Sequence, residues 1–371
     1  MKEIKLVLID DDKGDLQKYA NIFQLGLKDE YNISVKQITV EEINDNTSIL
    51  DSLDSDALLV DQELFRIESG NNILVINGVT LSMHLRQKYP NIPIFIFTNN
   101  KIPNIKESNY FDSEEYIDEF LIKGDYADIK LIKESEFVKI VEGYQNLREH
   151  EIKSFDDIIS ALSLPERNFE YIRDDVLETI PQKFLNSKIS ILHYYKIAKW
   201  IRKTLMNYPG LLYDDIHAAT FFGISVNSFR EKSIQEFFKS AKYKGLFSND
   251  KEMWWKSELI ECSDDFLDID ERQMPYSQGF QKGWEKKTGD KLDPAVCVYS
   301  NKTPADWICC VLNEPVMIKY TLRYLKDNRP SVMDEARICF KAIYDDKYNL
   351  EQIEAESREI FDDLFSRVGE N

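Results

Sequence analysis

Short apolar runs alternate with amphipathic stretches through the first 145 residues. The spacing of Leu16, Tyr19, Ile22 and Phe23 places apolar side chains on one face of a helix, and a second helical pattern is ended by Pro90. Apolar strands separated by helices are typical of a parallel sheet that is covered on both faces. We therefore predict strands over 5–9, 33–38, 56–60, 92–98 and 120–122, and helices over 16–27 and 78–90.

The pattern changes after about residue 145, where helical periodicity dominates. The sequence Ser-Phe-Asp-Asp from Ser154 is typical of a helix start, and 262–306 is richer in Gly, Pro and Asp and is expected to be irregular. We therefore predict an α/β domain over 1–145 and a mostly α-helical domain over 146–371, with a further division near 245–260. The long helices predicted in this part cover 187–207, 226–243 and 331–346.

Composition excludes several protein classes. The chain has 371 residues, 43% of them hydrophobic and 12% aromatic, which is enough for two packed cores and unlike a disordered protein. The formal net charge of −19 argues against general attraction to nucleic acid or to an anionic membrane. No run approaches the roughly 20 apolar residues of a spanning helix. The five cysteines have no CxxC spacing, which indicates reduced thiols, and we expect a cytoplasmic protein with no membrane partner.

Polar side chains follow the predicted strands of the first domain. Asp10 and Asp11 come directly after the first strand, Asp61 after the third, Thr98 ends the fourth and Lys123 ends the fifth. The carboxyl ends of parallel strands meet at one edge of an open sheet, so these groups are expected to converge. Three carboxylates in one place require a cation, and oxygen ligands suit Mg²⁺. A hydroxyl and an ammonium group beside that cluster could bind a phosphoryl group.

The arrangement of these residues resembles the receiver domain of two-component response regulators, a CheY-like fold with a five-stranded sheet in flavodoxin-like order. The segments that carry the resemblance are LIDDD at 8–12, ALLVDQEL at 57–64, GVTLSMHLRQKYPNIPIFIFT at 78–98 and EFLIK at 119–123. The sequence departs from the usual pattern in having Gly124 after the lysine, Asn99 after the threonine and long connections at 62–77 and 99–116.

The resemblance implies roles for individual residues. Asp61 would accept the phosphoryl group from a histidine kinase. Asp10, Asp11 and Asp61, with the backbone carbonyl of Glu63, would bind Mg²⁺. Thr98 and Lys123 would contact the phosphoryl oxygens. Phe120, with Thr98, would form the conformational switch, so the receiver could form a homodimer when phosphorylated.

The segment 213–233 has the spacing of a helix-turn-helix, with Ala219 in the first helix, Gly223 at the turn and Phe229 in the second helix. In that interpretation Asn227, Ser228 and Arg230 would contact DNA bases. Residues 187–245 contain ten Lys and Arg against four Asp and Glu, so the surrounding stretch is basic. An ordinary helical hairpin fits the same pattern, because Ala and Gly also allow close helix packing.

The second domain contains no nucleophile elbow, Walker loop, HExxH or GxGxxG motif, so we expect no enzyme activity there. We predict a bacterial phosphorelay response regulator whose unclassified C-terminal domain binds a downstream protein. One alternative is a transcriptional regulator that binds DNA through 213–233. A second alternative is a phosphate-sink receiver in a bacterial antiviral phosphorelay.

Overall fold

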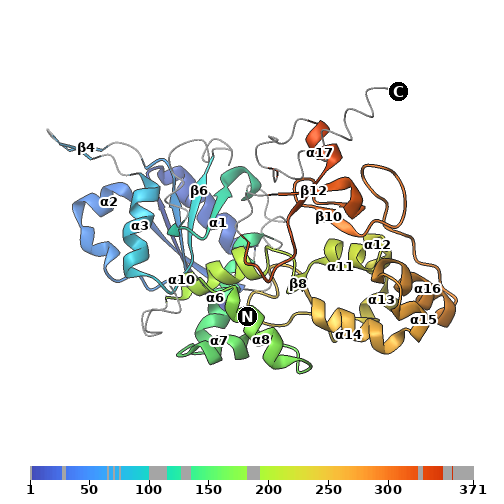
Figure 1. The fold of residues 1–371 in the computed structure, drawn as a ribbon. Helices are drawn as coiled ribbons and strands as arrows, with labels where there is room; N and C mark the ends of the chain where they lie inside the picture. The colour runs from blue at the N-terminus through green and yellow to red at the C-terminus, as the bar shows by residue number, and fades with distance from the viewer. Residues whose placement is uncertain are drawn as a thin grey trace. The chain divides into compact units, whose positions relative to one another are not determined.

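The chain folds into two compact units, which are described separately below (Figure 1). Met1–Ala161 and Asn186–Ile201 form the first unit, and Leu162–Leu185 and Arg202–Asn371 form the second. The boundary after residue 145 stays a prediction, and residues 146–161 group with the first unit. The computed structural model describes residues 2–26, 31–64, 67–69, 72–74, 77–99, 115–126, 135–181, 193–324, 329–345 and 353.

A five-stranded parallel sheet organises the first unit. Its order, β2-β1-β3-β6-β7, is the doubly wound order of a receiver domain, so the predicted fold class and the five predicted strands are confirmed. The central strands are buried along their whole length, which explains their uninterrupted apolar runs. The strands are β1 (Lys2–Asp10), β2 (Tyr31–Thr39), β3 (Ala57–Asp61), β6 (Ile94–Thr98) and β7 (Glu119–Ile122).

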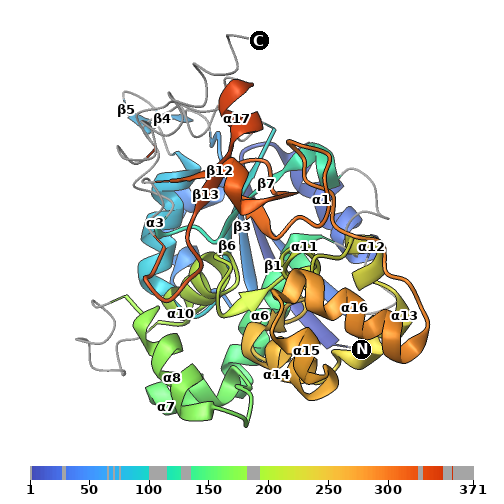
Figure 2. The same cartoon turned by 45° about the vertical axis from the view of Figure 1, so that its right-hand side comes forward.

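Helices cover both faces of this sheet, with α1 (Lys13–Gly26) and α3 (Gly78–Lys88) on opposite sides of the strands (Figure 2). On the α1 side, the ring of Phe137 from α6 (Glu136–Glu149) lies 5.1 Å from the ring of Phe23 and 5.2 Å from that of Phe95. On the other side, apolar residues of α2 and α3 pack against the strands. The remaining elements of the unit are α2 (Val40–Asp45), a 3-10 helix at Thr47–Leu50, β4 (Ile67–Ser69), β5 (Asn72–Leu74), a 3-10 helix at Lys123–Tyr126, α7 (Phe155–Ala161) and α10 (Tyr194–Trp200).

The second unit is largely helical in its described part, as predicted, and carries small two-stranded sheets, β8-β9, β10-β11 and β12-β13. Its helices are α8 (Phe169–Glu178), the π-helical turn Ile201–Leu205, which spans the unit boundary, α11 (Asp215–Phe221), α12 (Val226–Phe229), α13 (Lys232–Phe237), α14 (Lys256–Phe266), α15 (Ile269–Arg272), α16 (Tyr276–Thr288), the 3-10 turn Ile318–Tyr320 and α17 (Phe340–Tyr344). Its strands are β8 (Leu212–Tyr213), β9 (Trp254–Trp255), β10 (Trp307–Cys309), β11 (Glu314–Val316), β12 (Thr321–Arg323) and β13 (Arg337–Cys339).

Three predictions for this region were wrong in detail. The predicted helix 226–243 is broken into α12 and α13, because Glu231 has an extended backbone between them. The predicted helix 331–346 is reduced to α17, which follows the strand β13. The segment 262–306, expected to be irregular, contains the 13-residue helix α16. The part of the predicted helix 187–207 before His193 lies outside the described residues.

Two apolar cores form within the second unit. The first joins α11, α12, α13, α14 and α16 around aromatic rings, among them Phe222, Phe238, Trp254 and Phe280. The second lies around β10, β12, β13 and α17 and includes Cys309 and Cys339. The first core contains residues before and after 245–260, and the division near 245–260 stays a prediction.

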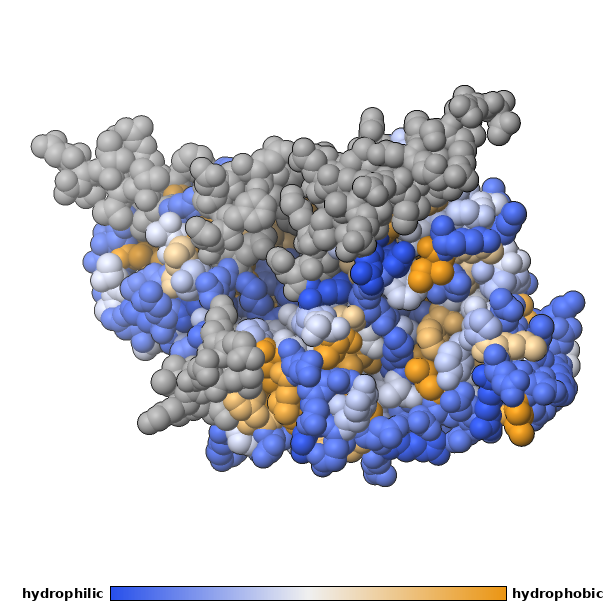
Figure 3. Space-filling view, viewed as in Figure 1, coloured by the Kyte–Doolittle hydropathy of each residue, from blue (hydrophilic) through white to orange (hydrophobic). Residues whose placement is uncertain are grey.

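Hydrophilic side chains dominate the described surface in the view of Figure 3, with separate apolar patches between them. Among the described helices, none is both long enough and apolar enough to cross a membrane.

Candidate functional site

The register of the sheet brings the predicted site residues to one edge. Ile9 pairs with Val60, so Asp10 and Asp61 follow at the same level on β1 and β3. Asp61 pairs with Phe97, and Thr98 then pairs with Ile122, the residue before Lys123. All four polar residues are buried, with Lys123 only 2% exposed. A fully charged cluster of this kind is stable only if its members neutralise one another.

Lys123 provides that neutralisation. Its Nζ lies 2.8 Å from Oδ2 of Asp10 and 2.7 Å from Oδ1 of Asp61. A third carboxylate, Asp15 in the first turn of α1, lies 3.0 Å from the same Nζ. The backbone of Lys123 is tied down as well, because the hydroxyl of Tyr19 donates a hydrogen bond to its carbonyl at 3.3 Å. The ammonium group is therefore fixed between the two strand-end aspartates.

Burial shifts the proton affinities of this cluster. It raises the pKa of Asp10 to about 6, although hydrogen bonds from Lys123 and from the backbone of Asp12 act in the opposite direction. Burial likewise raises the pKa of Asp61, against the hydrogen bond and charge of Lys123. For Lys123, burial acts to lower the pKa, but the hydrogen bonds to Asp10 and Asp61 outweigh it and the pKa is raised. Lys123 thus stays protonated in the physiological range.

The donor set fits a hard divalent cation. One carboxylate oxygen from each of Asp10, Asp11 and Asp61 lies within 4.8 Å of the others, and Asp11 is the exposed member of the three. Oxygen-only ligands on one open side suit Mg²⁺, which keeps several of its waters. The backbone N–H of Glu63 donates to Oδ2 of Asp61 at 2.7 Å, which folds this segment back over the site. The Glu63 carbonyl as a ligand stays a prediction.

The two residues predicted to form the switch differ in environment. Thr98 is a member of the buried cluster, and Phe120 lies three residues before Lys123. Thr98 is 1% exposed at the end of β6. Phe120 on β7 is half-buried and packs against the apolar core on the α3 side of the sheet. Phe120 is the second residue of β7, an edge strand of the sheet, and the switch role of both residues stays a prediction.

Sequence reasoning missed two residues of this site. Asp15 was not among the predicted site residues, although α1 returns it to the edge that β1 has just left. Gly78 opens α3, and a Cβ atom built there would lie 1.8 Å from the carbonyl oxygen of Asp61. Its N–H donates to the carbonyl of Gln62 at 3.1 Å. The helix can approach the Asp61 backbone this closely only because the residue has no side chain.

The predicted DNA-contacting residues are not presented together. The helix α12 has only four residues, Val226–Phe229. Ser228 is 1% exposed, and its hydroxyl accepts a hydrogen bond from the N–H of Asp293 at 2.9 Å. Asn227 and Arg230 are exposed, and Nε of Arg230 donates to Asp215 at 2.6 Å. Gly223 does form a turn with φ of 68°, but a Cβ there would clash with Ser277 of α16, so this glycine serves helix packing.

No family model and no curated protein matches this sequence. Among solved structures, the matches are mostly response regulator receiver domains that cover about 39% of the chain, its N-terminal part. A CheY-like receiver domain protein from Methanospirillum hungatei is 13% identical, and the match covers 39% of this chain and 99% of that one, with a TM-score of 0.28. A receiver domain protein from Clostridium thermocellum is 15% identical, with 40% and 99% covered and a TM-score of 0.27.

The response regulator TrrA from Thermotoga maritima, solved in complex with Mg²⁺ and BeF, is 20% identical, with 38% and 99% covered and a TM-score of 0.24. Scores this low carry no argument by themselves, so the fold assignment rests on the strand order and register.

Proposed function

We propose that the first unit is the phospho-accepting receiver of a response regulator, and that the second unit is a protein-binding output that the receiver controls. The observation that carries this proposal is the ammonium group of Lys123, held at 2.7–2.8 Å from the carboxylates of both Asp10 and Asp61 at the carboxyl edge of the sheet. This arrangement supports phosphoryl transfer, in which Asp61 would be the nucleophile, Asp10 and Asp11 the metal-binding pair, and Lys123 the fixed positive charge.

In the proposed reaction, a carboxylate oxygen of Asp61 attacks the phosphorus of a phosphohistidine on a partner kinase. A P–O bond to Asp61 forms as the P–N bond to the imidazole breaks, and the electron pair of that bond returns to the imidazole nitrogen, which takes a proton from water. Asp10, Asp11 and Asp61, with the Glu63 carbonyl, would hold Mg²⁺, which supplies charge neutralisation to the phosphoryl oxygens when bound. Lys123 then exchanges its contact with Asp61 Oδ1 for a phosphoryl oxygen, and Thr98 donates a hydrogen bond to another.

The chemistry implies a signalling protein rather than an enzyme with its own substrate turnover. The donor would be a histidine kinase in the cytoplasm, and the readout would be a change in protein contacts, including homodimerisation through the receiver. Loss of the Lys123–Asp61 contact on phosphorylation would release the residue that follows β7, so that β7, which carries Phe120, could rearrange.

Beryllofluoride, a phosphoryl mimic, tests this proposal on the full chain. We expect it to bind the wild type in the presence of Mg²⁺, to be displaced by EDTA, and to bind Asp61→Asn at least tenfold more weakly. The matched control is Asp125→Asn, an exposed carboxylate two residues after Lys123, which should bind like the wild type. Binding by Asp61→Asn equal to that of the wild type would refute the assignment of the phospho-acceptor. Binding is followed by ¹⁹F NMR, and a small phosphodonor with mass spectrometry checks that one phosphoryl group is added at Asp61.

A further inference from the structure

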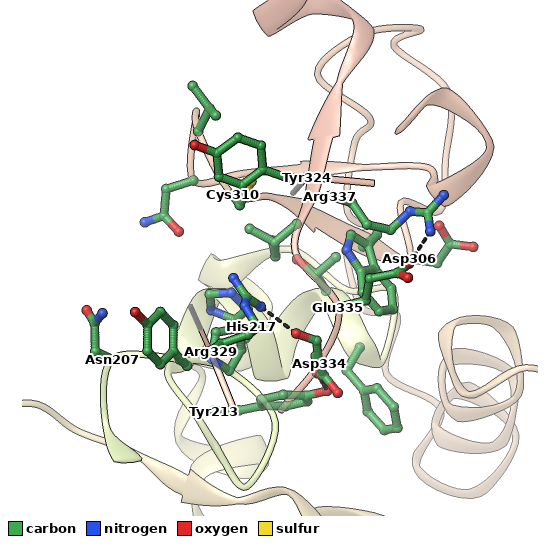
Figure 4. A pocket seen from close by; sticks show the side chains of 18 residues that line it. Asn207, Tyr213, His217, Asp306, Cys310, Tyr324, Arg329, Asp334, Glu335 and Arg337 are labelled. Atoms are coloured by element: carbon green, nitrogen blue, oxygen red, sulfur yellow. Dashed lines mark hydrogen bonds and ion pairs between the residues drawn. The ribbon is translucent and has the colours of Figure 1, made fainter. Parts of the chain in front are cut away.

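The second unit contains a cavity of about 430 Å³ that the proposed phosphorylation does not use. Figure 4 shows side chains from β8, α11, β13 and the segment before β13 facing one another around it. The volume lies within the usual range for small-molecule sites, roughly 300–1,000 Å³. All of its lining residues belong to the second unit and to the described part of the chain.

Thr220 gives this cavity an unmet polar requirement. The residue lies on α11, lines the cavity and is 1% exposed. Its Oγ1 has no hydrogen-bond partner, even though a threonine in a helix can bond to the carbonyl of the preceding turn. Leaving a buried hydroxyl unpaired has a cost in stability. A ligand with a hydrogen-bonding edge would remove that cost, whereas a purely apolar ligand would not.

His217 adds a second polar group on the same helix, one turn earlier. Its backbone N–H and its Nδ1 both engage Oδ1 of Asp214, at 2.9 and 2.7 Å. The ring is thereby held in one orientation, and Nε2 is the ring nitrogen that remains to contact a ligand. Thr220 and His217 together can bind a molecule that presents a donor and an acceptor along one edge.

Aromatic rings form much of the remaining wall and favour a planar ligand that can stack. These rings come from separate parts of the second unit. They belong to Tyr208, Tyr213, Phe221, Trp307 and Tyr324.

The charged residues of the wall are engaged with one another, with the protein backbone or with Lys256, which lies outside the wall. Arg337 pairs with Glu335, and the guanidinium of Arg329 donates to the backbone carbonyl of Asp334 (Figure 4). The Asp334 carboxylate lies 2.7 Å from Nζ of Lys256. Asp306 accepts a hydrogen bond from the N–H of Ile318 at 2.8 Å. Three lining carboxylates and two lining guanidinium groups give the wall no excess of positive charge for an anion.

We propose that this cavity is a binding site for an uncharged planar nitrogen heterocycle, a nucleobase or nucleoside. Its ring would stack on the aromatic wall, and its hydrogen-bonding edge would meet Thr220 and His217. The carboxylates would disfavour a phosphate group on the same molecule.

Calorimetry and thermal shift on the full chain, with the four common ribonucleosides and their 5′-monophosphates, test this proposal. We expect at least one nucleoside to bind and to bind more tightly than its monophosphate. Thr220→Val should weaken that binding roughly three- to tenfold, the effect of one neutral hydrogen bond. The variant should keep or slightly raise the melting temperature of the unliganded protein, because it removes a buried hydroxyl that has no partner.

The matched control is Ser263→Ala, which removes another buried and unpartnered hydroxyl, on α14 and outside the cavity wall. It should leave nucleoside affinity unchanged. Three results would overturn the proposal: no nucleoside binding at millimolar concentration, equal affinity for wild type and Thr220→Val, or tighter binding of a monophosphate than of its nucleoside.

Discussion

A single ammonium group organises the candidate site at the residue scale. Lys123 contacts Asp10, Asp15 and Asp61 within 3.0 Å, and these carboxylates come from three different elements. Removing a buried partner leaves a charge uncompensated, which costs far more than the net worth of the pair. Asp10, which ends β1, is therefore stable where it is because Lys123, directly after β7, lies at the same edge.

Gly78 is the residue whose replacement tests the packing behind Asp61. A methyl group there would overlap the Asp61 carbonyl, so α3 or the end of β3 must shift. We expect Gly78→Ala to destabilise the first unit by about 3 kcal/mol and to lower its melting temperature by roughly 5–10 °C. Gly124→Ala is the control, because its Cβ would meet only Ile122 Cγ2 at 4.0 Å. Melting curves of both variants test this prediction. Equal stability of the two variants would contradict it, because it would show that the backbone around Gly78 and Asp61 can shift at little cost.

Sequence could reveal the chemistry of the site but not all of its geometry. Asp10, Asp61, Thr98 and Lys123 stand at strand ends, which is a local signal, and the sheet register then brings them together. Gly78 must be a glycine because of its contact with Asp61, which lies 17 positions earlier across a long connection. The residues next to Gly78 in the sequence therefore give no sign of this requirement.

At the element scale, the predicted strands of the sheet agree with the structure. The predicted helix 226–243 does not, because a helix cap interrupts its apolar periodicity. The strands β3 and β6 are buried along their whole length, and all five strands of the sheet were predicted within a few residues of their observed ends. The stretch 226–243 keeps helical spacing, yet its backbone turns extended at Glu231 and α13 starts again. Tertiary packing around Phe229 and Phe238 decides that break, and periodicity alone cannot report it.

Helix α11 offers a test of capping and pH dependence. Asp214 is its N-cap and is buried, and it contacts His217 and Lys251. Burial acts to raise its pKa, but the hydrogen bonds and charges of these partners outweigh it and hold the pKa below the ordinary range. Because the folded-state pKa is depressed, the stabilisation is complete above the unfolded-state value, near pH 4, and is lost as the pH falls below it.

We therefore expect Asp214→Asn to lower the free energy of unfolding by about 1–2 kcal/mol at about pH 7, and the difference from wild type to shrink towards about pH 3. The difference in free energy of unfolding is measured by urea unfolding, and separately by hydrogen exchange in peptides from α11. Asp290 is exposed and is not the N-cap of any described helix, so Asp290→Asn should change the free energy of unfolding little at either pH. A difference that stays constant or grows as the pH falls would contradict the assigned direction of the pKa.

At the scale of the whole molecule, charge favours the proposed protein-binding output over the DNA-binding alternative. The chain carries a net charge of −19, and the locally basic stretch 187–245 is the part that could oppose it. In the structure, some of the basic side chains of that stretch pair with carboxylates. These pairs are Arg202–Asp250, Arg230–Asp215, Lys239–Glu236 and Lys242–Glu252.

Basic groups that are already paired release few counterions when DNA approaches, so their contribution to binding is small. We expect the full chain to show no retention of duplex DNA by fluorescence anisotropy even at about 50 mM salt, where phosphate contacts are strongest. Arg230→Ala should behave like the wild type, since its guanidinium is engaged by Asp215 and the neighbouring Ser228 is buried. Binding that weakens steeply with added salt and is lost in Arg230→Ala would contradict this prediction. That result would support α11 and α12 as a DNA-binding helix pair, because Arg230, which directly follows α12, would then be contacting the duplex.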